Sequence, residues 1–103
     1  MTVQERERRT YDIGKEVDRL LACRGARREL RRQRDALSKV GADAAVNAVR
    51  AALRTTGAAI RHAEHRLRFA QAQARGEGRI SPVAEDFVGR LLAKRKRAGA
   101  EAR

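Results

Sequence analysis

The arginines of this sequence form a cluster and a row, and both patterns suit phosphate binding. The segment CRGARRELRRQR holds six arginines within eleven residues, with Glu29 as the only acid among them. They are Arg24, Arg27, Arg28, Arg31, Arg32 and Arg34. On a helical projection they cover an arc of about 160° that faces away from Leu30 and Leu37. Because the planar guanidinium forks onto phosphate oxygens, we expect this cluster to contact nucleic acid.

A second set of arginines recurs at every seventh position between residues 54 and 75. Its members are Arg54, Arg61, Arg68 and Arg75. On a helix, the rise of about 1.5 Å per residue sets them about 10 Å apart, in a row about 30 Å long. Segment 43–75 contains only two acids, Asp43 and Glu64, so it does not alternate charge signs along this face. We interpret the row as a stripe that follows a nucleic-acid backbone; a solvated edge, or salt bridges to a neighbouring helix, is the alternative.

A third basic segment, KRKR, ends the last predicted helix. It comprises Lys94, Arg95, Lys96 and Arg97. Cations at this end suit the helix dipole, and we include these four residues in the predicted nucleic-acid-binding set.

Other reactive side chains are few, and none forms a recognisable catalytic group. His62 and His65 share one helical face, but a zinc site needs three or four ligands, so we expect no metal. Cys23 could be a thiol activated by the neighbouring Arg24 and Arg27, although its place on an apolar stripe favours a core residue. There is no glycine-rich phosphate loop and no serine beside a base. We therefore expect no enzyme activity and no cofactor.

The overall charge points to a polyanionic partner. The chain has 25 Lys and Arg residues against 13 Asp and Glu residues, a net charge of +12, and 21 of its cations are arginine. Such an excess predicts binding to nucleic acid first, and then to acidic proteins or anionic lipid. The aromatic content of 3% leaves little for base stacking or for anchoring in a membrane interface, so backbone recognition with little sequence specificity is favoured.

The apolar content is low for an independent fold. Leu, Ile, Val and Phe together make up 20 of 103 residues, near the level at which chains stay disordered. We therefore expect a partner, either a second copy, a larger complex or the polyanion itself. A single cysteine excludes an internal disulfide, and no apolar run is long enough to cross a membrane. We expect a cytoplasmic protein that does not enter membranes.

The elements that carry these side chains are all predicted to be helices, because Ala, Arg, Leu, Glu and Gln dominate and proline occurs once. We expect one domain, 1–97, folded as an all-α bundle of three or four helices, with a flexible tail at 98–103. The predicted helices are 3–23, 26–39, 43–75 and 82–97. Ser81 followed by Pro82 is a start signal for the last of them.

The helix at 43–75 is the expected spine of the bundle. Its seam of uncharged residues repeats as a heptad, typical of lengthwise helix packing. Position a holds Val46, Leu53, Ile60, Leu67 and Ala74, and position d holds Val49, Thr56, Ala63 and Ala70.

In the segment before residue 40, the apolar residues move from one helical face to another along the chain. One helical face holds Cys23, Ala26, Leu30, Leu37 and Val40, whereas Ile13, Val17, Leu20 and Leu21 share another that points nearly the opposite way. A break near Gly25 is the simpler interpretation, and one long helix clasped on two sides is the alternative.

The sequence thus predicts a small basic helical protein that binds nucleic-acid backbone without catalysis, as a subunit of a nucleoprotein complex or as a homodimer. The alternative is a helical interaction module, an adaptor or an inhibitor, that docks an acidic surface of a larger protein.

Overall fold

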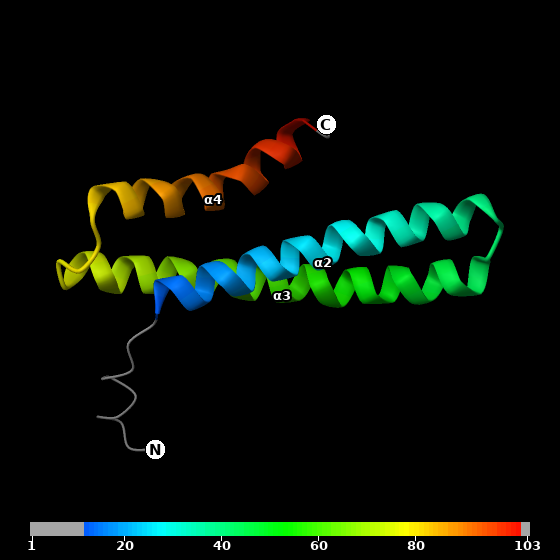
Figure 1. Ribbon diagram of the computed structural model, residues 1–103, viewed down its shortest axis with the longest axis horizontal. Helices are drawn as coiled ribbons and strands as arrows, with labels where there is room; N and C mark the ends of the chain where they lie inside the picture. Colours follow the sequence, from blue (N-terminus) through cyan, green and yellow to red (C-terminus); the bar gives the residue numbers. More distant parts are fainter. Residues whose placement is uncertain (1–11, 102–103) are drawn as a thin grey trace, which may run out of the picture. The chain divides into compact units, whose positions relative to one another are not determined.

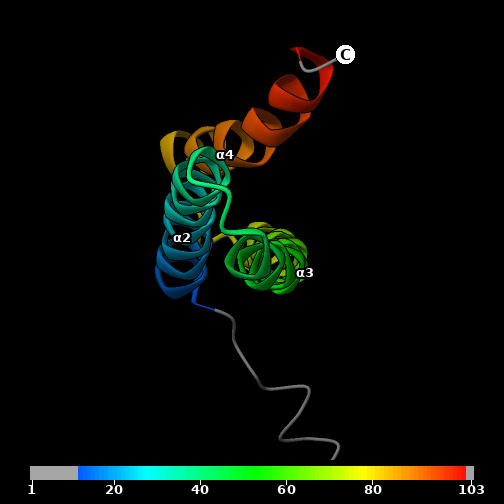
Figure 2. The same ribbon diagram turned by 90° about the vertical axis from the view of Figure 1, so that its right-hand side faces the viewer.

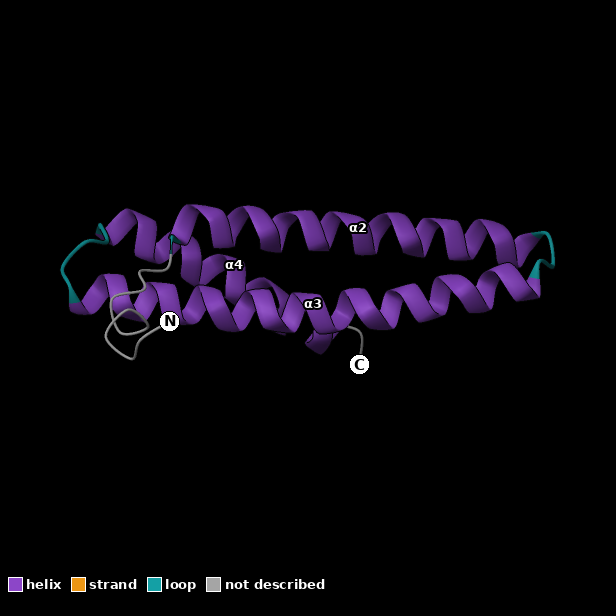
Figure 3. Cartoon of the chain, turned by 90° about the horizontal axis from the view of Figure 1, so that it is seen from below, coloured by secondary structure: helices purple, strands orange, loops and turns teal. Residues whose placement is uncertain are grey.

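Within residues 12–101 the protein forms three α-helices and no strand (Figures 1 and 3). They are α2 (Ile13–Lys39), α3 (Asp43–Gly76) and α4 (Pro82–Glu101). The structure is a computed structural model that describes these residues, with the side chains of residues 12–93. The predicted class, a small all-α bundle, is confirmed. The predicted start of the first helix at residue 3 lies outside the described residues.

Helix α2 runs through Gly25 without a break, which corrects the predicted boundary between helices at 3–23 and 26–39. A glycine inside a helix costs only about 1 kcal/mol relative to alanine, and good helix formers flank this one. Asp12 caps the start of α2, since the backbone N–H of Lys15 donates to its Oδ1 at 3.3 Å.

Backbone contacts group the chain into two compact units. The hairpin unit is Asp18–Ala63, and the terminal unit is Met1–Val17 with Glu64–Arg103.

In the hairpin unit, α2 and α3 run antiparallel and are joined by a three-residue turn (Figures 1 and 2). Gly41 occupies the left-handed region with φ of 72°, which only glycine adopts without strain. Its N–H donates to the carbonyl of Ser38, and the N–H of Ala42 donates to the carbonyl of Leu37, the paired bonds of a Schellman cap. The buried residues are Leu20, Val46, Ile60 and Ala63, the last three on the predicted seam.

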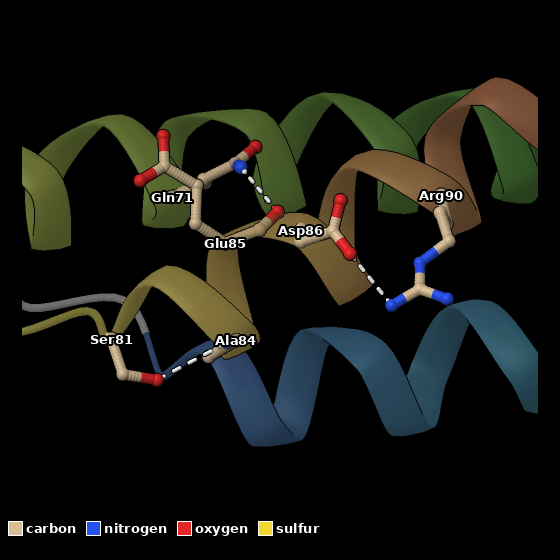
Figure 4. Close-up of polar contacts among 6 residues, drawn as sticks. All are labelled: Gln71, Ser81, Ala84, Glu85, Asp86 and Arg90. Atoms are coloured by element: carbon tan, nitrogen blue, oxygen red, sulfur yellow. Dashed lines mark hydrogen bonds and ion pairs between the residues drawn. The ribbon is translucent and has the colours of Figure 1, made fainter.

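In the terminal unit, α4 packs against the second half of α3. Ser81 caps α4 as predicted, its Oγ accepting a hydrogen bond from the N–H of Ala84 at 3.2 Å (Figure 4). The Gln71 side chain donates to the backbone carbonyl of Glu85 at 3.2 Å. The buried apolar residues are Val17, Leu67, Ala70, Ala74 and Val88. Two of these five residues are alanine, so the side chains that fill this contact are small.

Helix α4 continues to Glu101, four residues beyond its predicted end at 97. The predicted flexible tail at 98–103 is therefore helical over most of its length, because Ala98, Ala100 and Glu101 are good helix formers. Residues 102 and 103 lie outside the described residues.

Candidate nucleic-acid interface

The inner face of α2 in the hairpin includes arginines. Residues recurring every three or four positions are buried or half-buried there, namely Leu20, Cys23, Arg27, Leu30, Arg34 and Leu37. Arg24, one position from Cys23, is half-buried as well. The aliphatic stem of an arginine covers apolar surface while its guanidinium reaches polar groups or water, and the Nε of Arg27 is buried. The six clustered arginines therefore do not form one solvent-facing arc, which corrects the prediction.

The other three arginines of the cluster, Arg28, Arg31 and Arg32, are exposed. Arg32 pairs with Glu29 one turn away, at 3.5 Å, and Arg34 pairs with Asp35 at 3.3 Å. Exposed pairs of this kind contribute little, about 0–1 kcal/mol. Within the described part of the chain, Arg28 and Arg31 form no ion pair.

On α3, three exposed arginines lie on one flank of the hairpin. Arg54 and Arg61, at heptad position b, follow the half-buried Leu53 and the buried Ile60. Arg50 takes position e, beside b on the same flank. The guanidinium of Arg61 lies back over the preceding turn, where its Nη1 is 3.7 Å from the point that a β-carbon on Gly57 would occupy. The sequence prediction placed Arg50 on another flank and left it out of the site, which was wrong because position e adjoins position b.

The exposed arginines of the two helices share one face of the hairpin. Antiparallel helices are related by a twofold axis perpendicular to the plane through them, so positions b and e of both helices point to the same side. On α2, Arg28 takes position b and Arg31 takes position e of the heptad that contains Leu20 and Leu30. We call the set the hairpin arginine face: Arg28, Arg31, Arg50, Arg54 and Arg61.

The turn sets the register of these arginines. Arg28 precedes the end of α2 by eleven residues and Arg54 follows the start of α3 by eleven, so both lie about 16 Å from the turn at about 1.5 Å per residue. Arg31 and Arg50 are eight and seven residues from it, or about 12 Å and 10 Å. Two pairs of like charges thus lie at matching heights on facing helices.

The hairpin unit carries an excess of positive charge, and on α3 that charge lies on one flank. Asp18–Ala63 contains eleven Lys and Arg residues against four Asp and Glu residues. None of the five side chains of the hairpin arginine face pairs with an acid that the structure describes. The opposite flank of α3 in this unit holds no Lys, Arg, Asp or Glu; its residues are Ala45, Ala48, Ala52, Thr55, Ala59 and His62. Like charges gathered on one side repel one another and attract anions.

The terminal unit as a whole carries fourteen Lys and Arg residues against nine Asp and Glu residues, but the part of it whose side chains are described is balanced in charge. Residues 12–17 and 64–93 contain six basic and six acidic side chains. Four arginines there pair with acids: Arg66 with Glu16, Arg75 with Glu85, Arg79 with Glu77, and Arg90 with Asp86 (the last shown in Figure 4). Most of the cations described in this unit are therefore neutralised within it.

The predicted row along α3 divides between these two environments. Arg54 and Arg61 belong to the hairpin arginine face, whereas Arg68 and Arg75 belong to the terminal unit. All four side chains are exposed, as a stripe requires. Arg75, however, pairs with Glu85 of α4, which is the salt-bridge alternative considered for this row. Arg68 forms no ion pair within the described residues.

The other residues singled out from the sequence do not contribute to the hairpin arginine face. Lys94, Arg95, Lys96 and Arg97 lie on the α4 backbone, but their side chains lie outside the described residues. His62 and His65 are exposed, and His65 makes an edge contact with Phe69, ring centroids 5.0 Å apart. Cys23 is half-buried. Among residues whose side chains are described, no three potential metal ligands gather at one place.

No known protein family, curated protein or solved structure matches the chain. Within residues 12–101, no helix combines the length and the apolar content needed to cross a bilayer.

Proposed function

We propose that this protein binds the phosphate backbone of nucleic acid, without catalysis and with little sequence specificity, through the hairpin arginine face. The observation that carries the proposal is the contrast in pairing. Five exposed arginines share one side of the hairpin without an acid partner, whereas four arginines of the terminal unit are each paired with an acid. A surface that needed arginine only for solubility would carry mixed signs.

The side chains of the hairpin favour phosphate over bases. Arginine donates two parallel hydrogen bonds to phosphate oxygens and sheds its hydration readily. Asp18–Ala63 contains no Phe, Tyr or Trp, and aromatic side chains are the usual platforms for unstacked bases. Contacts to phosphate fix position but carry no sequence information, so we expect similar affinity for unrelated sequences.

The thin core supports the further proposal that the protein acts within a larger nucleoprotein complex or as a homodimer. Of the nine buried apolar residues described, three are alanine, and alanine contributes little apolar area. Binding to nucleic acid or to a second copy would stabilise the folded state by mass action.

Fluorescence anisotropy of a labelled 20-base-pair duplex tests the proposal with two variants of equal charge. Arg28→Gln with Arg54→Gln removes one cation from each helix of the hairpin arginine face. If each arginine releases one counterion equivalent, affinity falls about 60-fold at 0.1 M salt. Arg79→Gln with Arg90→Gln removes two paired cations from the terminal unit and should change affinity by less than about threefold, because only the screened long-range field is altered.

Equal losses for the two double variants would contradict a localised site and leave only non-specific attraction to net charge. Circular dichroism of each variant checks that helicity is unchanged, as expected because glutamine is nearly as good a helix former as arginine.

A second function is favoured by exposed apolar side chains in the terminal unit. Phe69 on α3 and Phe87 on α4 are 55% and 48% exposed, and Val83, one turn before Phe87, is 78% exposed. Aromatic side chains on a surface are typical anchors of protein interfaces. Under this alternative the protein is an interaction module that docks an acidic surface of a larger protein.

The two functions differ in their response to substitution. For an interaction module, Phe69→Ser should abolish partner binding, whereas arginine substitutions should mainly slow association. For a nucleic-acid-binding protein, Phe69→Ser should leave duplex affinity unchanged.

A further inference from the structure

The hairpin arginine face consists of two rows on separate helices. Arg28 and Arg31 form the α2 row, and Arg50, Arg54 and Arg61 form the α3 row. Their order from the turn places members of the two rows side by side. We infer that this face binds a nucleic-acid duplex rather than a single strand, with one row on each of the two strands that border a groove. The inference rests on the proposed function and specifies its ligand.

The spacing of the rows suits two backbones. Packed helix axes lie about 8–10 Å apart, and flexible arginine side chains extend outward from each helix. The grooves of B-form DNA are about 6 Å and about 12 Å wide, so the phosphates that line a groove fall within reach of both rows. A single strand has one line of phosphates and would occupy one row at a time.

The length of the hairpin arginine face also favours a ligand whose phosphates are closely spaced, as they are in a duplex. In the α3 row Arg61 lies eleven residues beyond Arg50, or about 16 Å along the helix. A DNA duplex carries one charge per about 1.7 Å of axis, and each strand alone one per about 3.4 Å. Five arginines on a patch of this length can all find phosphates on a duplex without bending it.

The hairpin arginine face lacks the aromatic side chains that would stack the unpaired bases of a single strand. Proteins that bind single strands combine a basic groove with aromatic side chains, each stacked base contributing about 1–3 kcal/mol. The hairpin has no Phe, Tyr or Trp, and its one imidazole, His62, takes heptad position c, on the flank opposite Arg61. A flexible strand would lose conformational freedom on a rigid pair of helices without that gain, whereas the phosphates of a duplex are already ordered.

The test compares a 20-base-pair duplex with each of its separated strands, as DNA and as RNA, by anisotropy between 50 and 200 mM NaCl. We expect tighter binding of the duplex at every salt concentration. If all five arginines contact phosphate on a duplex, duplex affinity falls about 500-fold across this range, against about 7- to 18-fold for a single strand that occupies one row of two or three arginines.

Row variants test the assignment of the two strands. Arg28→Gln with Arg31→Gln removes the α2 row, and Arg54→Gln with Arg61→Gln removes most of the α3 row. Each should lower the magnitude of the log–log salt slope on duplex by about 2. Arg79→Gln with Arg90→Gln is the matched control and should leave the slope unchanged.

The outcomes separate this inference from the proposed function. Equal or tighter binding of the single strand, or a duplex slope that responds to one row only, overturns the duplex assignment and leaves nucleic-acid binding intact. Failure of every nucleic acid to bind at 50 mM NaCl overturns the proposed function and this inference together.

Discussion

The guanidinium Nε of Arg66 donates to the carboxylate Oε2 of Glu16 at 3.0 Å, joining α3 to the first turn of α2 within the terminal unit. Fifty residues separate the two in sequence. The Glu16 side chain is 6% exposed and that of Arg66 is 37% exposed, so the acid depends on its partners more than the base does. Arginine here neutralises an internal acid, unlike the unpaired arginines of the hairpin.

Arg66→Gln should destabilise the fold by about 1–3 kcal/mol, because it removes a cation that pairs with the buried Glu16 carboxylate. The matched change Glu16→Gln should cost less, because it leaves an exposed cation and a neutral amide that can still accept a hydrogen bond. Urea unfolding followed by circular dichroism measures both. A smaller cost for Arg66→Gln than for Glu16→Gln would contradict the assigned pairing.

Two adjacent leucines test the phase of α2. Leu20 is fully buried and Leu21 is 45% exposed. Leu20→Ala should lower the free energy of unfolding by about 2–5 kcal/mol, because it leaves a cavity in a small core. Leu21→Ala should cost under about 1 kcal/mol, and thermal unfolding distinguishes the two. Similar costs would show that the helix is rotated from the position described here.

Two glycines of the hairpin should respond to alanine in opposite directions. Gly25 lies inside α2, and a β-carbon there would meet nothing within 4 Å. Gly25→Ala should therefore stabilise the protein by about 0.5–1 kcal/mol. Gly41→Ala should destabilise it by about 1–2 kcal/mol, because Gly41 has a positive φ that alanine adopts only with strain. Destabilisation by Gly25→Ala in urea unfolding would contradict a continuous α2.

Repulsion on the hairpin arginine face predicts a conflict between stability and binding. Arg31→Glu converts a like-charge pair with Arg50 into an attractive one, and should stabilise the fold by about 0.2–1 kcal/mol at 50 mM salt while weakening duplex binding. At 1 M NaCl, where the Debye length is about 3 Å, the repulsion between Arg31 and Arg50 should be screened, and the stabilisation by Arg31→Glu should vanish with it. Arg32→Glu serves as the control, because it places a second acid beside Glu29 and should destabilise slightly. Equal effects of the two substitutions on thermal stability would contradict the register assigned to the hairpin.

The seam of α3 was predictable because every a and d position is uncharged, so a simple heptad count identified Val46, Ile60 and Leu67 as core. The inner face of α2 could not be predicted in the same way, because Arg27 and Arg34 occupy seam positions there. Arginine stems pack as apolar groups although hydropathy counts them as polar. The false break at Gly25 came from grouping Leu20 with Val17 and Leu21, whereas Leu20 is buried on the face that also holds Cys23 and Leu30.

The sequence identified most arginines of the candidate site, but not which arginines form ion pairs with acids. Spacing along one helix correctly placed Arg54 and Arg61 on an exposed flank. It could not show that Arg75 meets Glu85, because that acid follows a loop and belongs to α4. Nor could it show that Arg50 and Arg31 share a face, since this depends on the antiparallel packing of two helices.

The most direct measurement is a titration of duplex DNA into isotopically labelled protein, followed through the arginine Nε–H signals in nuclear magnetic resonance spectra. The signals of Arg28, Arg31, Arg50, Arg54 and Arg61 should shift in proportion to bound duplex, and those of Arg79 and Arg90 should stay in place. Shifts confined to arginines of the terminal unit, or no shifts at 50 mM salt, would contradict phosphate binding by the hairpin arginine face.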